Sequence, residues 1–213
     1  MSKVRAHISV SLDGHVAGPN QSMEEPLGVG GERLHDWLVA QKIWREAQGL
    51  EGGEENVSTD ILAEEYANVG AEIMGRGKFG PPSRGAWGDD PWQGWWGDNP
   101  PFHKPVFVLT HHAREPLTLA DTTFTFVTDG IQAALAQARA ASRDKDVFIG
   151  GGAATINEFL AAGLLDEIEL HVVPILLGGG ARLFERVGDV RLEQVRSVEA
   201  PGVTHLKYRV RFQ

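Results

Sequence analysis

The alternation of apolar and polar side chains along the chain predicts its strands. Residues 4–10 alternate strictly between the two classes, which is the two-residue period of a strand with one buried face. Short apolar or alternating stretches predict further strands at residues 71–74, 106–109, 123–127, 147–149, 168–173, 191–198 and 204–212. Turn residues such as Gly and Pro separate these stretches.

Apolar residues at three- and four-residue spacing predict the helices. They fall at about residues 32–48, 58–68 and 130–141, and a further helix is expected to follow Gly152. Ser58 or Thr59 is the expected cap of the second helix. Strands and helices alternate along most of the chain, and mainly strands follow. This order predicts one α/β domain over residues 1–213, with a mixed, mostly parallel sheet, flanking helices and an antiparallel C-terminal edge.

Composition narrows the class of protein. The 213 residues carry a net charge of -9 without any run of Lys or Arg, so no nucleic-acid partner is expected. The absence of cysteine excludes disulfides, thiol catalysis and cysteine-based zinc sites. The chain has no apolar stretch long enough for a membrane span, and its first residues lack the apolar region of a signal peptide. A cytoplasmic protein without membrane contact is therefore expected.

Two glycine-rich turns follow apolar strands, and each is a candidate anion site. Gly75, Arg76 and Gly77 end one strand, and residues 150–152 end another and open a helix. In open α/β sheets, ligands bind beyond the carboxyl ends of the strands, where glycine lets backbone N–H groups approach a phosphate. The alternative for both turns is a strand-to-helix connection that needs glycine only for its backbone geometry.

Residues 75–80 also match G-x-G-x-x-G, the pattern of dinucleotide-binding folds. That pattern must open a helix, whereas Gly80 is followed by Pro81 and Pro82 and no helical period follows. The match is therefore interpreted as accidental. The capacity of a glycine turn to hold phosphate remains, with Arg76 and Lys78 as positive charges.

Polar residues at two other strand ends are further candidates. Thr110 and His111 follow the strand at 106–109, where a polar cluster can contact a ribose or its phosphate; an ordinary exposed turn is the alternative. No metal site is expected from His111 and His112, because adjacent side chains rarely face the same way and no third ligand stands at a usual spacing. Asp13 follows the first strand and is typical of a turn, although its carboxylate is also a candidate to orient a substrate or deliver a proton.

Residues 80–105 form a long irregular segment that carries four tryptophans. Loops of this length in compact domains usually have a function or pack as a flap. The rings are suited to stacking on a flat heterocycle. Packing at a dimer interface, or packing that holds the segment down, is slightly preferred.

Together these segments resemble the RibD C-terminal domain family of the dihydrofolate-reductase-like superfamily, and most closely its stand-alone bacterial members. The resemblance covers nearly the whole chain, and its short motifs are specific as an ordered set. They are Ser11-Leu12-Asp13-Gly14, Met74-Gly75-Arg76, Phe107-Val108-Leu109-Thr110, Ile149-Gly150-Gly151-Gly152, Leu164-Leu165-Asp166-Glu167-Ile168, Pro174-Ile175-Leu176-Leu177-Gly178-Gly179-Gly180 and Leu183-Phe184.

The resemblance implies a dihydrofolate-reductase-like three-layer fold with about eight strands and NADPH across the carboxyl ends of the strands. It implies that the loop 13–31 borders the nicotinamide and the substrate, and that the protein is a homodimer. The implied cofactor contacts are Gly75, Arg76 and Gly77 for the phosphates, Thr110 and His111 for the adenosine ribose and its 2′-phosphate, and Gly150, Gly151, Gly152, Ala153 and Thr155 for the pyrophosphate.

The implied activity is hydride transfer from the nicotinamide to a small heterocyclic or carbonyl/imine substrate, as in the 5-amino-6-(5-phosphoribosylamino)uracil reductase of riboflavin biosynthesis. Asp13 and Asp36 are the candidate catalytic residues. Asp36 precedes Trp37, roughly where dihydrofolate reductases carry a pterin-binding carboxylate. A dihydrofolate reductase, another small-molecule reductase, or a dinucleotide-binding protein without catalysis remain the alternatives.

Two departures from the resembled families matter. His111 and His112 stand where dihydrofolate reductases often carry an arginine, and a neutral imidazole holds a 2′-phosphate less firmly than a guanidinium does. The zinc deaminase half of full-length RibD has no counterpart in a chain without cysteine.

Overall fold

The computed structural model describes residues 2–82, 85–89 and 91–212. Its strands are β1 (Val4–Ser11), β2 (His15–Ala17), β3 (Val69–Gly75), β4 (Pro105–Leu109), β5 (Leu117–Leu119), β6 (Thr122–Val127), β7 (Asp146–Ile149), β8 (Glu167–Val173), β9 (Ala181–Arg182), β10 (Val190–Ala200) and β11 (Val203–Phe212). Its helices are the 3-10 helix η1 (Gly31–His35) and α1 (Asp36–Val39), α2 (Lys42–Ala47), α3 (Val57–Ala67), α4 (Arg76–Phe79), α5 (Gly130–Ala141) and α6 (Ala153–Ala161).

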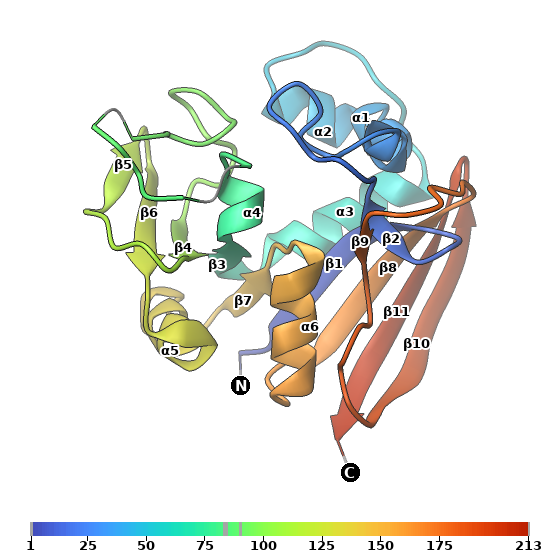
Figure 1. The fold of residues 1–213 in the computed structure, drawn as a ribbon. Coiled ribbons are helices and arrows are strands. Elements are labelled where there is room, and N and C mark those ends of the chain that lie inside the picture. The colour runs from blue at the N-terminus through green and yellow to red at the C-terminus, as the bar shows by residue number, and fades with distance from the viewer. Residues whose placement is uncertain (1, 83–84, 90, 213) are drawn as a thin grey trace.

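Over these residues, one nine-stranded sheet forms, in the order β10-β11-β8-β1-β7-β3-β4-β6-β5 (Figure 1). The six strands from β8 to β6 are parallel to one another. Strands β10 and β11 form an antiparallel edge, and β5 is antiparallel at the opposite edge. The predicted mixed, mostly parallel sheet with an antiparallel C-terminal edge is therefore confirmed. Strands β2 and β9 pair separately as a two-stranded sheet.

The two faces of the central sheet differ in chemistry. On one face, α5 and α6 pack over apolar side chains of β1, β3, β7 and β8, which form the largest core cluster. On the opposite face, a small apolar cluster around Leu34, Trp37 and Leu62 lies under α3 and α1 (Figure 1). A second cluster on that face, which includes Met74, Val108 and Phe124, packs with Phe79 of α4. Beneath α3 the sheet instead presents charged and histidine side chains of β1, β8 and β11. Burying an apolar face is the usual reason why a helix packs on a sheet, so this polar layer is unusual.

The prediction of one continuous helix over about residues 32–48 is wrong. The structure has η1, α1 and α2 in its place, because Gln41 adopts an extended backbone with a φ of -74° and a ψ of 138°. Its extended backbone pairs with Glu54, whose carbonyl accepts from Lys42 N at 2.9 Å and whose N–H donates to Ala40 O at 2.8 Å. The loop that returns from α2 supplies these hydrogen bonds. The backbone N–H and C=O groups near Gln41 are therefore paired without a continuous helix.

Two further local expectations are corrected. Asn56, and not Ser58 or Thr59, is the cap of α3: its side chain accepts from Ser58 N at 2.9 Å, while the hydroxyl of Thr59 accepts from Asn56 N at 3.1 Å. The sequence predicts no helix after Gly75, but one turn of helix, α4, begins there and ends before Gly80.

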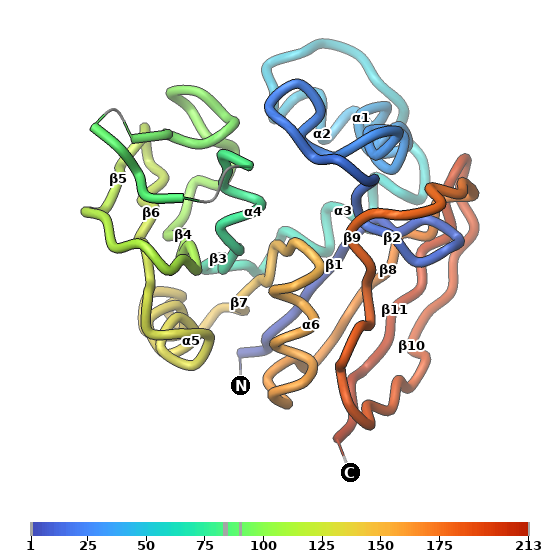
Figure 2. The backbone as a smooth tube through the Cα atoms, in the orientation of Figure 1, coloured from blue at the N-terminus to red at the C-terminus, as the bar shows by residue number. Residues whose placement is uncertain are grey.

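The segment between α4 and β4 folds beside α4 and β6, away from α1 and α2 (Figure 2). Trp87, Trp92 and Trp96 pack partly buried against the cluster that contains Phe79 and Phe124. The indole N–H of Trp87 donates to His112 O at 2.8 Å, and that of Trp92 donates to Phe79 O at 2.9 Å. These three rings therefore hold the segment down, as the sequence slightly favoured. In the part of the chain that the structure describes, no helix is both long and apolar enough to cross a membrane.

Candidate active site

A cleft of about 950 Å³ opens beyond the carboxyl ends of the parallel strands. Its wall includes the last residues of β3, β4 and β6 and the residue that follows β7. Nine of the ten cofactor residues expected from the sequence line this cleft, and Gly151 is the exception. The nine are Gly75, Arg76, Gly77, Thr110, His111, Gly150, Gly152, Ala153 and Thr155.

The two glycine turns are joined by backbone hydrogen bonds. Gly75 N donates to Gly151 O at 2.8 Å, and Gly150 N donates to Ile73 O at 2.8 Å. A Cβ on Gly75 would lie 2.4 Å from Thr155 Oγ1, and one on Gly150 would lie 2.0 Å from Glu72 Oε1. A Cβ on Gly152 would meet nothing within 4 Å. Two glycines are thus required by the packing of the protein itself, whereas Gly152 leaves open space before the first turn of α6.

Basic side chains gather at this wall although the whole chain is acidic. Arg76 is buried, and its guanidinium lies 3.7 Å from the centre of the Trp87 ring. Lys78 Nζ contacts Glu72 Oε1 at 2.9 Å, and both Arg76 and Lys78 line the cleft. Arg182, at the end of β9, contributes a third cation to the lining. Glu158 and Glu185 also line the cleft. The three cations outnumber these two carboxylates, and with a helix N-terminus in the wall they suit the cleft to an anionic ligand.

The two expected catalytic carboxylates lie outside the residues that line the cleft. Asp13 accepts from Ser11 Oγ at 2.6 Å, from Leu177 N at 3.1 Å and from Gly178 N at 2.7 Å. These hydrogen bonds, led by that of Ser11, hold the pKa of Asp13 well below its usual value. Asp36 is exposed at the start of α1. Asp13 therefore joins the β1 turn to the loop after β8, and neither carboxylate faces the cavity.

The floor of the cleft is a polar cluster that the sequence did not predict. Side chains from the polar face of β1 and β8 line it: His7, Ser9 and His171. Trp37 lies beside them and donates its indole N–H to Ser9 Oγ at 3.1 Å. The floor is thus built from elements far apart in the chain.

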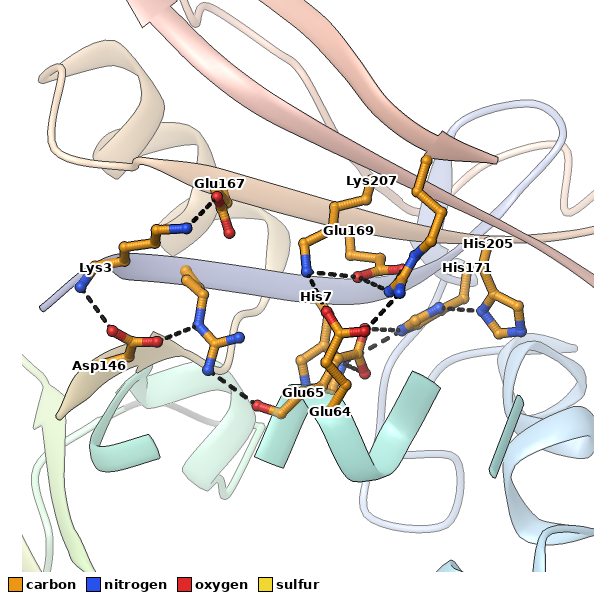
Figure 3. Close-up of polar contacts among 12 residues, drawn as sticks. Lys3, His7, Glu64, Glu65, Asp146, Glu167, Glu169, His171, His205 and Lys207 are labelled. Atoms are coloured by element: carbon orange, nitrogen blue, oxygen red, sulfur yellow. Dashed lines mark hydrogen bonds and ion pairs between the residues drawn. The ribbon is translucent and has the colours of Figure 1, made fainter. Parts of the chain in front are cut away.

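Glu65 of α3 meets two of these histidines (Figure 3). Its Oε2 lies 3.3 Å from His7 Nδ1 and its Oε1 lies 3.4 Å from His171 Nε2. The two histidine nitrogens are 3.3 Å apart. His171 Nδ1 is 2.8 Å from His205 Nδ1, and His205 Nε2 is 2.9 Å from Ser58 Oγ. A chain of polar contacts therefore runs from α3 through β11 and β8 to β1 and back to α3.

Burial controls the charges in this cluster. It raises the pKa of Glu65 to about 8. It lowers the pKa values of His171 and His205 to about 4, and that of His7 well below its usual value. Without a further ligand, all four groups are thus mainly neutral at pH 7.

Beside the cluster, two cations are already engaged. Arg196 contacts Glu64 at 2.6 Å and Glu169 at 2.8 Å, and Lys207 contacts the same two carboxylates at 2.8 and 3.7 Å (Figure 3).

Comparison with known proteins identifies the family. The sequence matches the profile of the RibD C-terminal domain over residues 2–206. This chain belongs to the RibD C-terminal domain family. It is 26% identical over 188 residues to YwjB of Bacillus subtilis strain 168, an uncharacterized protein, and the match covers 87% of this chain and 84% of YwjB.

Solved structures show the same fold. A protein of Shewanella sp. PV-4 named for riboflavin biosynthesis superposes with a TM-score of 0.65 at 23% identity, covering 99% of both chains. RibD of Acinetobacter baumannii gives 0.59 at 18% identity, with 100% of this chain matched to 59% of that protein. A pyrimidine reductase-like protein of Corynebacterium diphtheriae gives 0.52 at 12% identity, covering 100% of this chain and 93% of that one. The dihydrofolate-reductase-like fold expected from the sequence is confirmed.

A signal for the polar floor was present in the sequence of this RibD C-terminal domain. Central parallel strands, buried on both faces, usually consist of nearly continuous apolar residues. Here β1 alternates apolar residues with Arg5, His7 and Ser9, and β8 alternates them with Glu167, Glu169 and His171. Two adjacent parallel strands with this alternation place ionisable groups on one buried face.

Proposed function

We propose that this RibD C-terminal domain is an NADPH-dependent reductase that transfers hydride to a small heterocyclic or carbonyl/imine substrate. Family membership supports a reductase of the type found in riboflavin biosynthesis. The observation that carries the proposal is the convergence of the two glycine turns and the Thr110 cluster on one cleft. When bound, the nicotinamide supplies the hydride, and the protein binds, orients and shields it.

The residues present fit a dinucleotide. The open space before Gly152, at the start of the nine-residue helix α6, is suited to a pyrophosphate whose oxygens need close backbone approach. Arg76 and Lys78 would add positive charge beside it. Thr110 is buried at the end of β4 and His111 is exposed, so an adenosine ribose would be held at that rim. Preference for NADPH over NADH then depends on how firmly His111 and its neighbours hold a 2′-phosphate.

The substrate would occupy the opposite part of the cleft. Gln21, Pro26 and Leu27, from the loop between β2 and η1, line the same cavity as Trp37 and His171. This half combines apolar side chains with a small number of polar groups, which is typical of a site that orients a flat heterocycle. We propose a pyrimidine of the riboflavin pathway as the first substrate to test and dihydrofolate as the second. We further propose that the enzyme is a cytoplasmic homodimer.

Titration with NADPH and, separately, NADH is the decisive experiment. Trp37, Trp95 and Trp96 line the cleft, so excitation transfer from tryptophan to a bound nicotinamide is expected. Saturable transfer, tighter for NADPH, followed by substrate-dependent NADPH oxidation, is the expected result. Absence of binding by both dinucleotides would refute the proposal. Binding without turnover on any substrate of either class would instead indicate a dinucleotide-binding protein without catalysis.

A further inference from the structure

We infer that His7, Glu65 and His171 form a binding site for one divalent transition-metal ion, zinc by preference, at the floor of the cleft. Among the described residues, these three form a group whose ligand atoms all lie within 4.8 Å of one another. The sequence predicts no metal at the adjacent His111 and His112, and neither of these residues belongs to the cluster. The three ligands here come from β1, α3 and β8, so their spacing in the sequence does not predict a metal site.

The geometry of the three side chains fits a zinc ion at their centre. The two histidine nitrogens lie 3.3 Å apart, and each faces a different oxygen of Glu65, at 3.3 Å for His7 and 3.4 Å for His171. Imidazole nitrogens and carboxylate oxygens bind zinc at about 2.0–2.1 Å, and at tetrahedral angles such ligands lie about 3.3–3.4 Å apart. The two histidine nitrogens therefore already have the separation that a tetrahedral site requires, and a carboxylate oxygen of Glu65 lies within 4.8 Å of both.

Hydrogen bonding among the three groups explains this arrangement poorly. N–H···O bonds have donor–acceptor distances of about 2.7–3.2 Å, and the contacts between Glu65 and each histidine are longer. Within the described residues, neither carboxylate oxygen of Glu65 has a hydrogen-bond partner of normal geometry, although the Glu169 carboxyl group lies near enough to lower its pKa. The glutamate side chain is only 4% exposed. A buried carboxylate in this position needs either a proton or a cation, and an ion bound by one of its oxygens would supply the cation.

No side-chain cation fills that role. Arg196 and Lys207 are held by Glu64 and Glu169. Arg5 contacts Asp146 at 2.9 Å and donates to the backbone carbonyl of Glu65, and neither contact involves the Glu65 carboxylate. The other polar neighbours of the carboxylate are the Glu169 carboxyl group and the two imidazoles, whose nitrogens are metal ligands when neutral.

The surroundings of His171 also match a metal ligand. Metal-binding histidines usually donate their second ring N–H to a fixed acceptor, which sets the tautomer and the orientation of the ring. His171 Nδ1 has such a partner in His205 Nδ1 at 2.8 Å, and His205 is held in turn by Ser58 Oγ (Figure 3). With the proton on Nδ1 of His171, its Nε2 lone pair points to Glu65 and His7.

The site would keep one open coordination position. Three protein ligands with two histidines and one glutamate are a known catalytic zinc arrangement, in which water or substrate takes the fourth position. His7 and His171 line the cleft, while Glu65 reaches them from α3. The fourth ligand would therefore come from the cleft, as water or as an oxygen or nitrogen atom of a bound molecule.

Cobalt titration tests this site without reference to catalysis. The full-length, tag-free protein is treated with EDTA, freed of chelator and titrated with Co²⁺, because four-coordinate Co²⁺ absorbs in the visible range whereas Zn²⁺ is silent. The expected result is one Co²⁺ bound per chain with the spectrum of a four-coordinate ion, displaced by one equivalent of Zn²⁺.

Substitutions at graded distance from the ion make the test specific. Glu65→Gln and His171→Ala should each weaken Co²⁺ binding beyond the roughly 10–100-fold expected for His205→Ala, which removes only the outer hydrogen bond. His103→Ala, at an exposed histidine that contacts Asp121, should leave binding unchanged and controls for general histidine affinity. Circular dichroism confirms that each variant is folded.

Three outcomes would overturn the inference: no stoichiometric Co²⁺ or Zn²⁺ binding to the wild-type protein, binding that Glu65→Gln and His171→Ala leave unchanged, or a loss equal to that of His103→Ala. Each of these results stands apart from dinucleotide binding, so the metal site and the reductase proposal can fail independently.

Discussion

At the residue scale, neighbouring glycines of one turn have different reasons to be glycine. Gly150 cannot carry a Cβ because the carboxylate of Glu72 already occupies that space. Gly152, two residues on, faces open space at a φ of -70°, which any residue can adopt. The protein alone therefore explains Gly150, and a ligand is the better explanation of Gly152.

Gly152→Ala should leave stability nearly unchanged and weaken NADPH binding by at least about tenfold, or about 1.4 kcal/mol, because the new methyl group would occupy the space left for the pyrophosphate. Gly75→Ala is the matched contrast: its Cβ would clash with Thr155, so the melting temperature should fall. Thermal unfolding and NADPH titration measure the two effects. Undiminished NADPH affinity in Gly152→Ala would show that this turn does not bind the pyrophosphate.

His35 makes the stability depend on pH. Burial lowers its pKa to about 4, whereas in the unfolded chain a histidine titrates near about 6.5. Between about pH 6.5 and 4, His35 is therefore protonated in the unfolded state and neutral in the folded state. The free energy of unfolding falls as the pH is lowered through this range. His35→Gln should lose less melting temperature than the wild type between pH 7 and pH 5. The exposed His103→Gln serves as the control, and an equal loss in His35→Gln and the wild type would contradict the assignment.

At the element scale, the segment between α4 and β4 shows how a loop can support a binding wall. Trp87 covers the guanidinium of Arg76 on one side and packs on Phe126 on another. Its indole N–H also ties the segment to the turn after β4. The ring therefore joins Arg76, which is proposed to lie beside the phosphates, to the rim that is proposed to hold the ribose.

Trp87→Ala should lower the free energy of unfolding by about 2–3 kcal/mol, somewhat less than the ~3–5 kcal/mol for a fully buried tryptophan. It should also weaken dinucleotide binding, because Arg76 loses the ring that holds it. Trp87→Phe keeps a ring and loses one hydrogen bond, so its cost should be about 1 kcal/mol. Urea unfolding distinguishes the two variants, and equal stabilities would show that the ring does not hold the segment.

The elements also show how far the sequence could be interpreted. Most strands and helices along the chain, and the glycine turns that line the cleft, were predictable, because periodicity and glycine turns are local signals. The break at Gln41 was not, since it depends on pairing with Glu54 across a returning loop. The His7–Glu65–His171 cluster depends on which strands become neighbours in the sheet, and Asp13 was misleading because its partners lie in the distant loop after β8. Contacts between distant segments were therefore what sequence patterns could not supply.

At the scale of the whole molecule, the cleft joins segments from most of the chain. The loop after β2, the turn after β3, the start of α6 and the β9 strand all contribute to it. A ligand that spans the cleft would contact all of these segments at once, so its binding energy would be expressed in global stability.

NADPH at about 100 times its dissociation constant should raise the free energy of unfolding by about 2.7 kcal/mol. For a chain of this size, the melting temperature should then rise by roughly 5–10 °C, at about 2–4 °C per kcal/mol. Thermal unfolding with and without NADPH measures this shift, and the Gly152→Ala protein at the same NADPH concentration is the control. Saturating NADPH without any shift would show that the dinucleotide does not bind the folded state selectively.

The alternation in β1 carries a further consequence, for the insertions and deletions that this gene can tolerate. Ala6 and Val10 belong to the apolar core, while His7 and Ser9 belong to the floor of the cleft. Removing one residue within β1 would exchange the two sets, sending imidazole into the core and aliphatic side chains to the floor. Alternate residues of one short strand thus supply both the core and the floor of the cleft. Single substitutions can alter either one, but any change in the length of β1 would damage both at once.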